Sequence, residues 1–158
     1  MPRPYASAVL NASADEVWSY LRDFSNLAAW MPGVETGIIE DGGPADRVGC
    51  VRRLIGPGSS VFRERLSAFD DAARTYRYEI LECPLPVSAA RGVLRVSPVT
   101  DTGQAFVEWW GEFSAAPADE EAMLKTFGNG IYATGLQALS RRFAGLSRTS
   151  AAASPGRP

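Results

Sequence analysis

The sequence predicts an α+β fold in which a seven-stranded antiparallel sheet wraps around one long C-terminal helix, with two short helices near the N-terminus. Three observations predict it: a helix-capping motif after the first strand, closely spaced turn signals through the middle of the chain, and a helical apolar stripe near its end. The 158 residues match the length of a single domain.

The N-terminal part reads as one strand and two helices. Residues 5–10 alternate weakly and form the first strand. Ser13 and Glu16 match a capping box, so a helix is expected to begin at Ser13. Apolar residues at helical spacing over 24–31, ended by Pro32 and Gly33, predict a second, shorter helix.

Turn signals rich in Gly, Pro and Asp divide the middle of the chain into segments rich in β-branched and aromatic residues. Because the connections are short, the strands are expected to pair in an antiparallel order. We expect six strands here, at residues 34–40, 47–55, 60–69, 74–83, 89–98 and 104–114.

The last helix is expected over 118–146, since an acidic first turn suits the helix dipole and apolar residues follow at helical spacing. Beyond it the composition changes to Ser, Ala, Pro, Gly and Arg. Residues 1–146 are therefore expected to form the domain, and residues 147–158 a disordered tail. The expected apolar stripe is Leu124, Phe127, Ile131, Leu136, Leu139 and Phe143.

Composition excludes several function classes. The chain has no histidine, which removes Ser-His-Asp chemistry and every His-based metal site. Its two cysteines have no metal-ligand spacing, so no metal or cofactor is expected. A net charge of −2 without basic runs argues against a nucleic-acid partner. No membrane span or secretory signal is readable, which predicts a cytoplasmic protein.

Short motifs occur in the order found in one superfamily, and the chain resembles it over about residues 4–146. The superfamily is SRPBCC, which includes START domains, Bet v 1-like proteins, bacterial polyketide cyclase/dehydrase-like proteins and the plant abscisic acid receptors. The matching segments are 14–18, 48–52, 63–66, 85–87, 108–109 and 127–139.

The resemblance implies a helix-grip (Bet v 1-like) fold with a cavity for a small apolar molecule between sheet and helix. Glu64 matches a cavity glutamate of the abscisic acid receptors, residues 55–59 their gate loop and residues 83–88 their latch loop. The receptors' ligand-anchoring lysine falls on Ala28, and their latch His-Arg pair on Leu85-Pro86. Abscisic acid or a similar acid is therefore not expected as the ligand.

Strand alternation independently points Glu64 inward, because Arg63 and Arg65 belong in water. A buried carboxylate is costly unless paired or hydrogen-bonded. Glu64 is thus either a general acid or base, or the structural partner of an arginine. Arg53 is the expected partner, since its strand and that of Glu64 should form a hairpin.

Three further positions stay open. The resemblance puts Glu108 and Trp110 inside the cavity, whereas binary patterning buries Trp109 instead, and a bulge would reconcile the two. Tyr78 either places its hydroxyl in the cavity or packs with its hydroxyl at the rim. Gly135 and its neighbouring helical glycines leave room for a ligand or for tight packing.

The candidate catalytic residues are Glu64, Tyr78 and Arg53, which would move a proton or polarise a carbonyl. Met31 and Trp30 end the second helix and are candidate ligand contacts. The other candidate ligand contacts are Val51, Phe62, Ile80, Leu85, Gly92, Glu108, Trp110, Phe127, Ile131 and Gly135.

The leading hypothesis is binding of a hydrophobic, aromatic or polyketide-like molecule, with cyclisation, dehydration or isomerisation as the reaction. The alternative is a non-catalytic small-molecule or lipid carrier, or a sensor with a gated cavity, because one fold hosts both functions. A homodimer is compatible with an outward tryptophan at 109–110.

Overall fold

The computed structural model describes residues 1–151, with side chains described through residue 144. A seven-stranded antiparallel sheet in the order β1-β7-β6-β5-β4-β3-β2 forms the body of the protein. Its elements are β1 (Tyr5–Ser13), α1 (Ala14–Leu21), a 3₁₀ turn (Asn26–Ala29), β2 (Thr36–Ile39), β3 (Val51–Ile55), a 3₁₀ turn (Pro57–Ser59), β4 (Val61–Asp70), β5 (Thr75–Glu82), β6 (Ser88–Pro98), β7 (Gln104–Ser114), α2 (Glu120–Lys125), a π-helical segment (Thr126–Ala133) and α3 (Thr134–Ala151).

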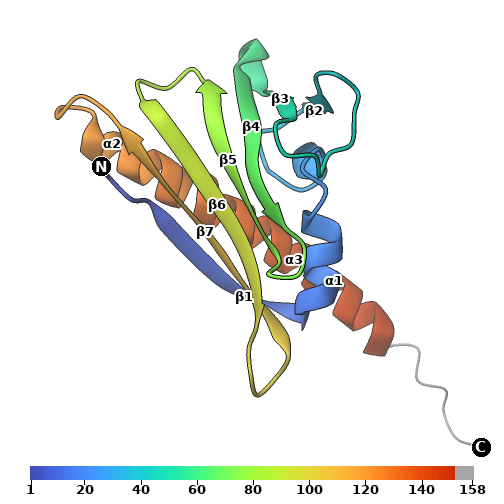
Figure 1. Ribbon diagram of the computed structural model, residues 1–158. Helices are drawn as coiled ribbons and strands as arrows, with labels where there is room; N and C mark the ends of the chain where they lie inside the picture. The colour runs from blue at the N-terminus through green and yellow to red at the C-terminus, as the bar shows by residue number, and fades with distance from the viewer. Residues whose placement is uncertain (152–158) are drawn as a thin grey trace, which may run out of the picture.

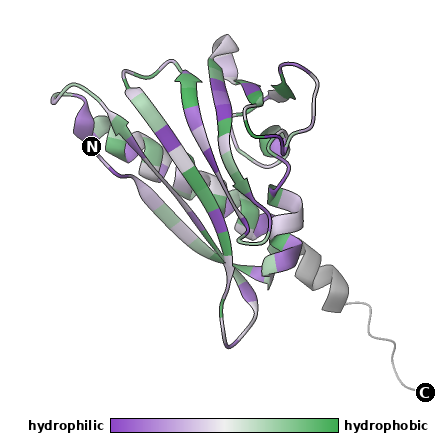
Figure 2. Cartoon of the chain, in the orientation of Figure 1, coloured by the Kyte–Doolittle hydropathy of each residue, from purple (hydrophilic) through white to green (hydrophobic). Residues whose placement is uncertain are grey.

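The C-terminal helix lies across one face of the curved sheet, and the core fills the space between them (Figure 1). Along β7 buried and half-buried residues alternate strictly, which is the pattern of a strand with one face on the core. The alternation of apolar and polar residues is visible along several strands in Figure 2. This arrangement confirms the predicted fold class and the expected strand pairing.

The outer face of the sheet carries the arginines that the sequence placed in water. They pair with glutamates on neighbouring strands, as in Arg95 with Glu108 at 2.7 Å and Arg65 with Glu79 at 2.5 Å. Such exposed pairs contribute about 0–1 kcal/mol each. Because these charged pairs mark the face of the sheet that meets water, the opposite face is the one that packs against the C-terminal helix.

The C-terminal helix differs from its prediction at both ends and in the middle. It begins at Glu120 and extends to Ala151, beyond the predicted end at residue 146. Residues 152–158 of the predicted tail lie outside the described residues. Each turn of the π-helical segment contains one more residue than an α-helical turn. The next buried side chain after Phe127 is therefore that of Tyr132. Uniform α spacing had missed Tyr132.

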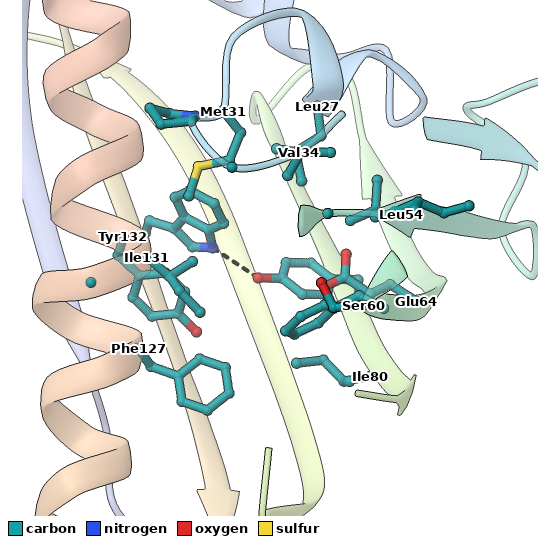
Figure 3. A pocket seen from close by; sticks show the side chains of 18 residues that line it. Leu27, Met31, Val34, Leu54, Ser60, Glu64, Ile80, Phe127, Ile131 and Tyr132 are labelled. Atoms are coloured by element: carbon teal, nitrogen blue, oxygen red, sulfur yellow. Dashed lines mark hydrogen bonds between the residues drawn. The ribbon is translucent and has the colours of Figure 1, made fainter. Parts of the chain in front are cut away.

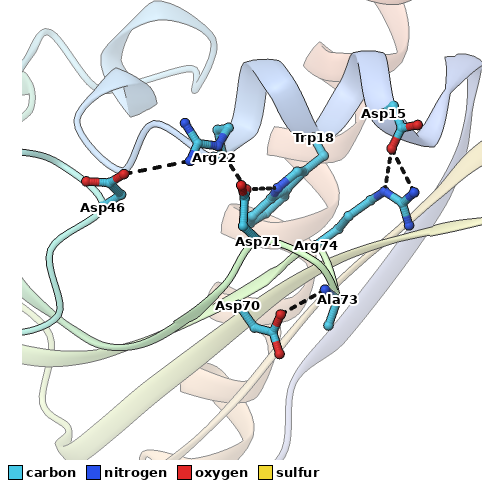
Figure 4. Close-up of polar contacts among 8 residues, drawn as sticks. All are labelled: Asp15, Trp18, Arg22, Asp46, Asp70, Asp71, Ala73 and Arg74. Atoms are coloured by element: carbon cyan, nitrogen blue, oxygen red, sulfur yellow. Dashed lines mark hydrogen bonds and ion pairs between the residues drawn. The ribbon is translucent and has the colours of Figure 1, made fainter.

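Helix α1 is fixed at its start and along its length. Ser13 and Glu16 form the predicted capping box. The Trp18 indole donates a hydrogen bond to Asp71 at 2.7 Å, and Arg22 donates to the same carboxylate at 2.9 Å (Figure 4). These bonds hold α1 against the turn between β4 and β5, at one end of the sheet.

Within residues 1–151, no helix is long and apolar enough to cross a membrane. The same part of the chain has no cluster of three or more Cys, Asp or Glu side chains arranged to hold a metal ion.

Candidate functional site

A cavity of about 180 Å³ lies between the sheet, the π-helical segment and the loop that follows the first 3₁₀ turn (Figure 3). Seven residues proposed from the sequence line it: Met31, Phe62, Glu64, Tyr78, Ile80, Phe127 and Ile131. The structure adds lining residues that the sequence reasoning missed, namely Leu27, Pro32, Gly33, Val34, Leu54, Ile55, Gly56, Ser60, Trp109, Gly130 and Tyr132.

Glu64 points inward, as predicted, and is 5% exposed. Its partner is Arg52 and not Arg53, which corrects the sequence-based expectation. Arg52 and Glu64 are direct register partners on β3 and β4, so their side chains share the inner face. Arg53 is one position out of phase and lies exposed on the outer face.

The guanidinium of Arg52 is held from three sides, although it is only 1% exposed. Its Nε donates to Glu64 Oε2 at 2.6 Å, and Nη2 lies 2.6 Å from the same oxygen. Its Nη1 donates to the Phe24 carbonyl at 3.0 Å, while the Phe24 ring lies 3.9 Å beneath the guanidinium carbon. Arg52 therefore neutralises the charge of Glu64 from behind.

Both Arg52 contacts use Oε2, and no described residue donates a hydrogen bond to Glu64 Oε1. Glu64 itself lines the cavity. Glu64 is thus held in place by Arg52, which also compensates its charge. Its second oxygen, Oε1, has no hydrogen bond from a described residue and is available to the predominantly apolar cavity. This geometry lets Glu64 accept a proton or a hydrogen bond from a bound molecule.

Two tyrosine hydroxyls occupy the floor of the cavity. The Trp109 indole donates to Tyr78 Oη at 2.8 Å, and the Trp109 and Tyr132 rings stack with centroids 4.8 Å apart. Space for the two hydroxyls comes from Gly92 on β6 and Gly111 on β7, which are register partners without side chains. A Cβ at Gly92 would overlap Tyr78, and one at Gly111 would lie 2.5 Å from Tyr132 Oη.

Burial sets the protonation of these tyrosines. Desolvation raises the pKa of Tyr78 well above its ordinary value, and the nearby Tyr132 and Glu64 add to the rise. Desolvation and the charge of Glu64 likewise raise the pKa of Tyr132, while a hydrogen bond from Tyr78 offsets part of that rise. Both phenols are therefore neutral hydrogen-bond donors at physiological pH, not bases.

The remaining predicted residues do not line the cavity. Trp30 and Gly135 pack behind it, where a Cβ at Gly135 would meet Met31 Sδ at 2.8 Å, and this contact corresponds to the tight-packing interpretation. Gly92 lies beneath the Tyr78 ring, and Leu85 is a partly buried neighbour of the core.

Val51 was a candidate ligand contact, and the orientation of Glu108 and Trp110 was open between the family resemblance and binary patterning; all three lie on the outer face, as binary patterning predicts for Glu108 and Trp110. Pairing between β6 and β7 runs without a shift from Arg91 to Pro98, so no bulge turns the tryptophans over. Trp109 is consequently the inward one, at 3% exposure. Glu108 instead pairs with Arg95 and accepts a hydrogen bond from the Tyr5 hydroxyl at 2.9 Å.

One side of the cavity, here called its mouth, is lined by the loop expected to act as a gate and by the loop after the first 3₁₀ turn. A Cβ at Gly56 would lie 2.8 Å from the Gly33 carbonyl oxygen, so the two loops nearly touch. The Gly56 amide donates to the Ser60 carbonyl at 2.9 Å, which closes the gate loop on itself.

Comparison with known protein families identifies this architecture. Residues 1–144 match the family described as polyketide cyclase / dehydrase and lipid transport. The chain belongs to this family. The match includes every element that contributes to the cavity, from the first strand to the C-terminal helix.

Solved structures agree with the assignment. The protein XoxI from Bacillus cereus superposes with a TM-score of 0.83 at 31% sequence identity, covering 93% of this chain and 99% of that one. A protein from Thermobifida fusca gives 0.83 at 29% identity, covering 92% and 95%. The ZhuI aromatase/cyclase from a Streptomyces species gives 0.73 at 21% identity, covering 90% and 93%, and shares the fold.

Proposed function

We propose that the cavity binds one small hydrophobic molecule, aromatic or polyketide-like in character, and that Glu64 transfers a proton to and from it. The enzyme would act as a cyclase, dehydratase or isomerase without a metal or redox cofactor. The observation that carries the proposal is the Arg52-held carboxylate of Glu64, which lines a predominantly apolar cavity and whose Oε1 receives no hydrogen bond from a described residue.

Proton transfer at this site balances without a co-reactant. Glu64 Oε1 takes the proton from a C–H next to a substrate carbonyl, and the C–H electron pair moves into the carbonyl to form an enolate. Glu64 then returns the proton to another carbon in an isomerisation, to a departing hydroxyl in a dehydration, or to the alkoxide formed when the enolate carbon closes a ring. Arg52 keeps the carboxylate oriented throughout.

The family description, which includes both cyclases and lipid transport, supports ligand binding in either role. A carrier or sensor is the second candidate, favoured by the near contact of Gly56 with Gly33 at the mouth. A cavity of about 180 Å³ is below the roughly 300–1,000 Å³ of common ligand sites. In either role, a large ligand requires these loops to part.

The test uses phenylacetone, a neutral one-ring ketone, in deuterated buffer. Exchange of its benzylic protons is followed by NMR with and without the protein. We expect the native protein to accelerate exchange and Glu64→Gln to abolish the acceleration, while Glu79→Gln on the outer face retains it. Equal acceleration by native protein and Glu64→Gln would contradict the role of Glu64. Binding of phenylacetone without accelerated exchange would favour the carrier.

A further inference from the structure

The cavity has a polar group opposite Glu64, the Tyr132 hydroxyl, that neither the sequence nor the proposed proton transfer accounts for. Tyr132 comes from the helix and Glu64 from the sheet, and the two lie on opposite sides of the cavity in Figure 3. Of the lining residues, none is Lys or Arg, so the charge of Glu64 is compensated only from behind, by Arg52.

The hydrogen bond between Trp109 and Tyr78 has a fixed direction. An indole N–H only donates, so the bond from Trp109 at 2.8 Å occupies the oxygen of Tyr78 as an acceptor. The Tyr78 proton is thereby directed away from Trp109. The Tyr132 hydroxyl lies close by, because Gly92 leaves space for Tyr78 and its register partner Gly111 leaves space for Tyr132.

The hydroxyl of Tyr132 has no acceptor among the described residues, and its ring is held by the stack on Trp109. Since Tyr132 lines the cavity, its O–H is available to a bound molecule. Desolvation, which raises the pKa of this phenol, keeps it in the donating form.

We propose that Tyr132 is the hydrogen-bond donor that holds the carbonyl oxygen of the ligand, and that the pair of Tyr132 and Glu64 selects a neutral, single-ring molecule with a carbonyl directed toward Tyr132 and an acidic C–H next to that carbonyl directed toward Glu64. This inference rests on the proposed function, because it assigns the ligand of the same cavity. During proton transfer the same O–H would stabilise the enolate oxygen.

The volume of the cavity and the negative charge of Glu64 limit the class of ligand that can bind. A cavity of about 150 Å³ can hold a benzene molecule, so the observed 180 Å³ accommodates one ring and a short side chain with the loops as they stand. A carboxylate ligand would be repelled by Glu64, and no lining cation is present to offset that repulsion. The site therefore favours a ketone over the corresponding acid.

The test compares three molecules of nearly the same shape. Phenylacetone has a carbonyl, isobutylbenzene replaces its oxygen with a methyl group, and phenylacetate carries a negative charge. Binding is measured by calorimetry to the native protein, to Tyr132→Phe and to Tyr20→Phe. Tyr20 is a matched control because its hydroxyl is buried without a partner and lies outside the cavity lining.

We expect Tyr132→Phe to weaken phenylacetone binding by roughly threefold to tenfold, the effect of one hydrogen bond, and to leave isobutylbenzene unchanged. Tyr20→Phe should change neither. Phenylacetate should bind far more weakly than phenylacetone. With ¹³C-labelled carbonyl, the infrared C=O stretch of bound phenylacetone should fall in frequency in the native protein and in Tyr20→Phe, but not in Tyr132→Phe.

Two outcomes overturn the inference while leaving the proposed function intact: equal losses of phenylacetone and isobutylbenzene in Tyr132→Phe, or tight binding of phenylacetate. If Tyr132→Phe fails to fold, the infrared spectrum of the native protein still tests the inference. A C=O stretch of bound phenylacetone that is not shifted would contradict the inference. Failure of all three molecules to bind the native protein would overturn the proposed function and the assignment of Tyr132 with it.

Discussion

The buried pair of Arg52 and Glu64 is the part of the structure most sensitive to a single substitution. In Arg52→Met the apolar stem is kept and the charge is removed. Glu64 would then be a carboxylate at 5% exposure without its two contacts at 2.6 Å. The carbonyl of Phe24 would lose its bond at 3.0 Å as well.

The magnitude follows from these losses. Removing one partner of a buried ion pair costs about 3–5 kcal/mol, because the other charge stays buried and uncompensated. We therefore expect Arg52→Met to lower the free energy of unfolding by about 3–5 kcal/mol, measured by urea denaturation at pH 7. The double variant Arg52→Met/Glu64→Leu should recover most of that loss, since it leaves no buried charge.

Arg53→Met is the matched control, because Arg53 is the adjacent residue on the exposed face. Its effect should stay within about 0.5 kcal/mol, as for other surface substitutions. A loss below about 1 kcal/mol in Arg52→Met, the value of a surface ion pair, would refute the reasoning. So would a double variant as unstable as the single one.

Gly111→Ala should destabilise by about 1–3 kcal/mol in thermal unfolding, because the added Cβ would overlap the backbone carbonyl oxygen of Arg91 and lie 2.5 Å from Tyr132 Oη. Gly128→Ala, whose nearest neighbour is 3.8 Å away, should instead stabilise by about 0.5–1 kcal/mol in the same assay. Ser13→Ala removes the capping box of α1 and should cost about 1 kcal/mol in the same assay, with no measurable loss contradicting its contribution. Since burial raises the pKa of Tyr78 and Tyr132, the unfolded chain releases these protons first, so stability is complete below about pH 10 and falls as the pH rises above it. The phenolate absorbance of Tyr78 and Tyr132, obtained as the difference between the native protein and the double variant Tyr78→Phe/Tyr132→Phe, should appear only with unfolding. Its appearance in the folded protein would contradict the assigned burial.

The capping motif, the turn signals and the apolar stripe of the last helix were enough to predict the fold class. Strand alternation was enough to predict the orientation of Glu64, because exposed arginines fix which face of each strand meets water. It could not select Arg52 over Arg53. The prediction placed both on the partner strand, but only the observed register shows that Arg52 lies opposite Glu64. A shift of one residue exchanges the two faces, and no local signal fixes that register.

The helix side of the site was less predictable. The π-helical segment advances burial to Tyr132, and a search at α spacing finds Ile131 instead. The pairing of Gly92 with Gly111, which makes space for the two hydroxyls, depends on two strands in register and is not visible in either strand alone. The grouping of Trp109, Tyr78 and Tyr132 at the cavity therefore emerges only in three dimensions.

A crystal structure of the complex with phenylacetone tests the central claim most directly. We predict that the ring lies in the cavity among Phe62, Ile80 and Ile131, with the carbonyl oxygen at the Tyr132 hydroxyl and the benzylic carbon facing Glu64 Oε1. An empty cavity, with the ligand bound instead on the outer face beside Trp110, would contradict the account.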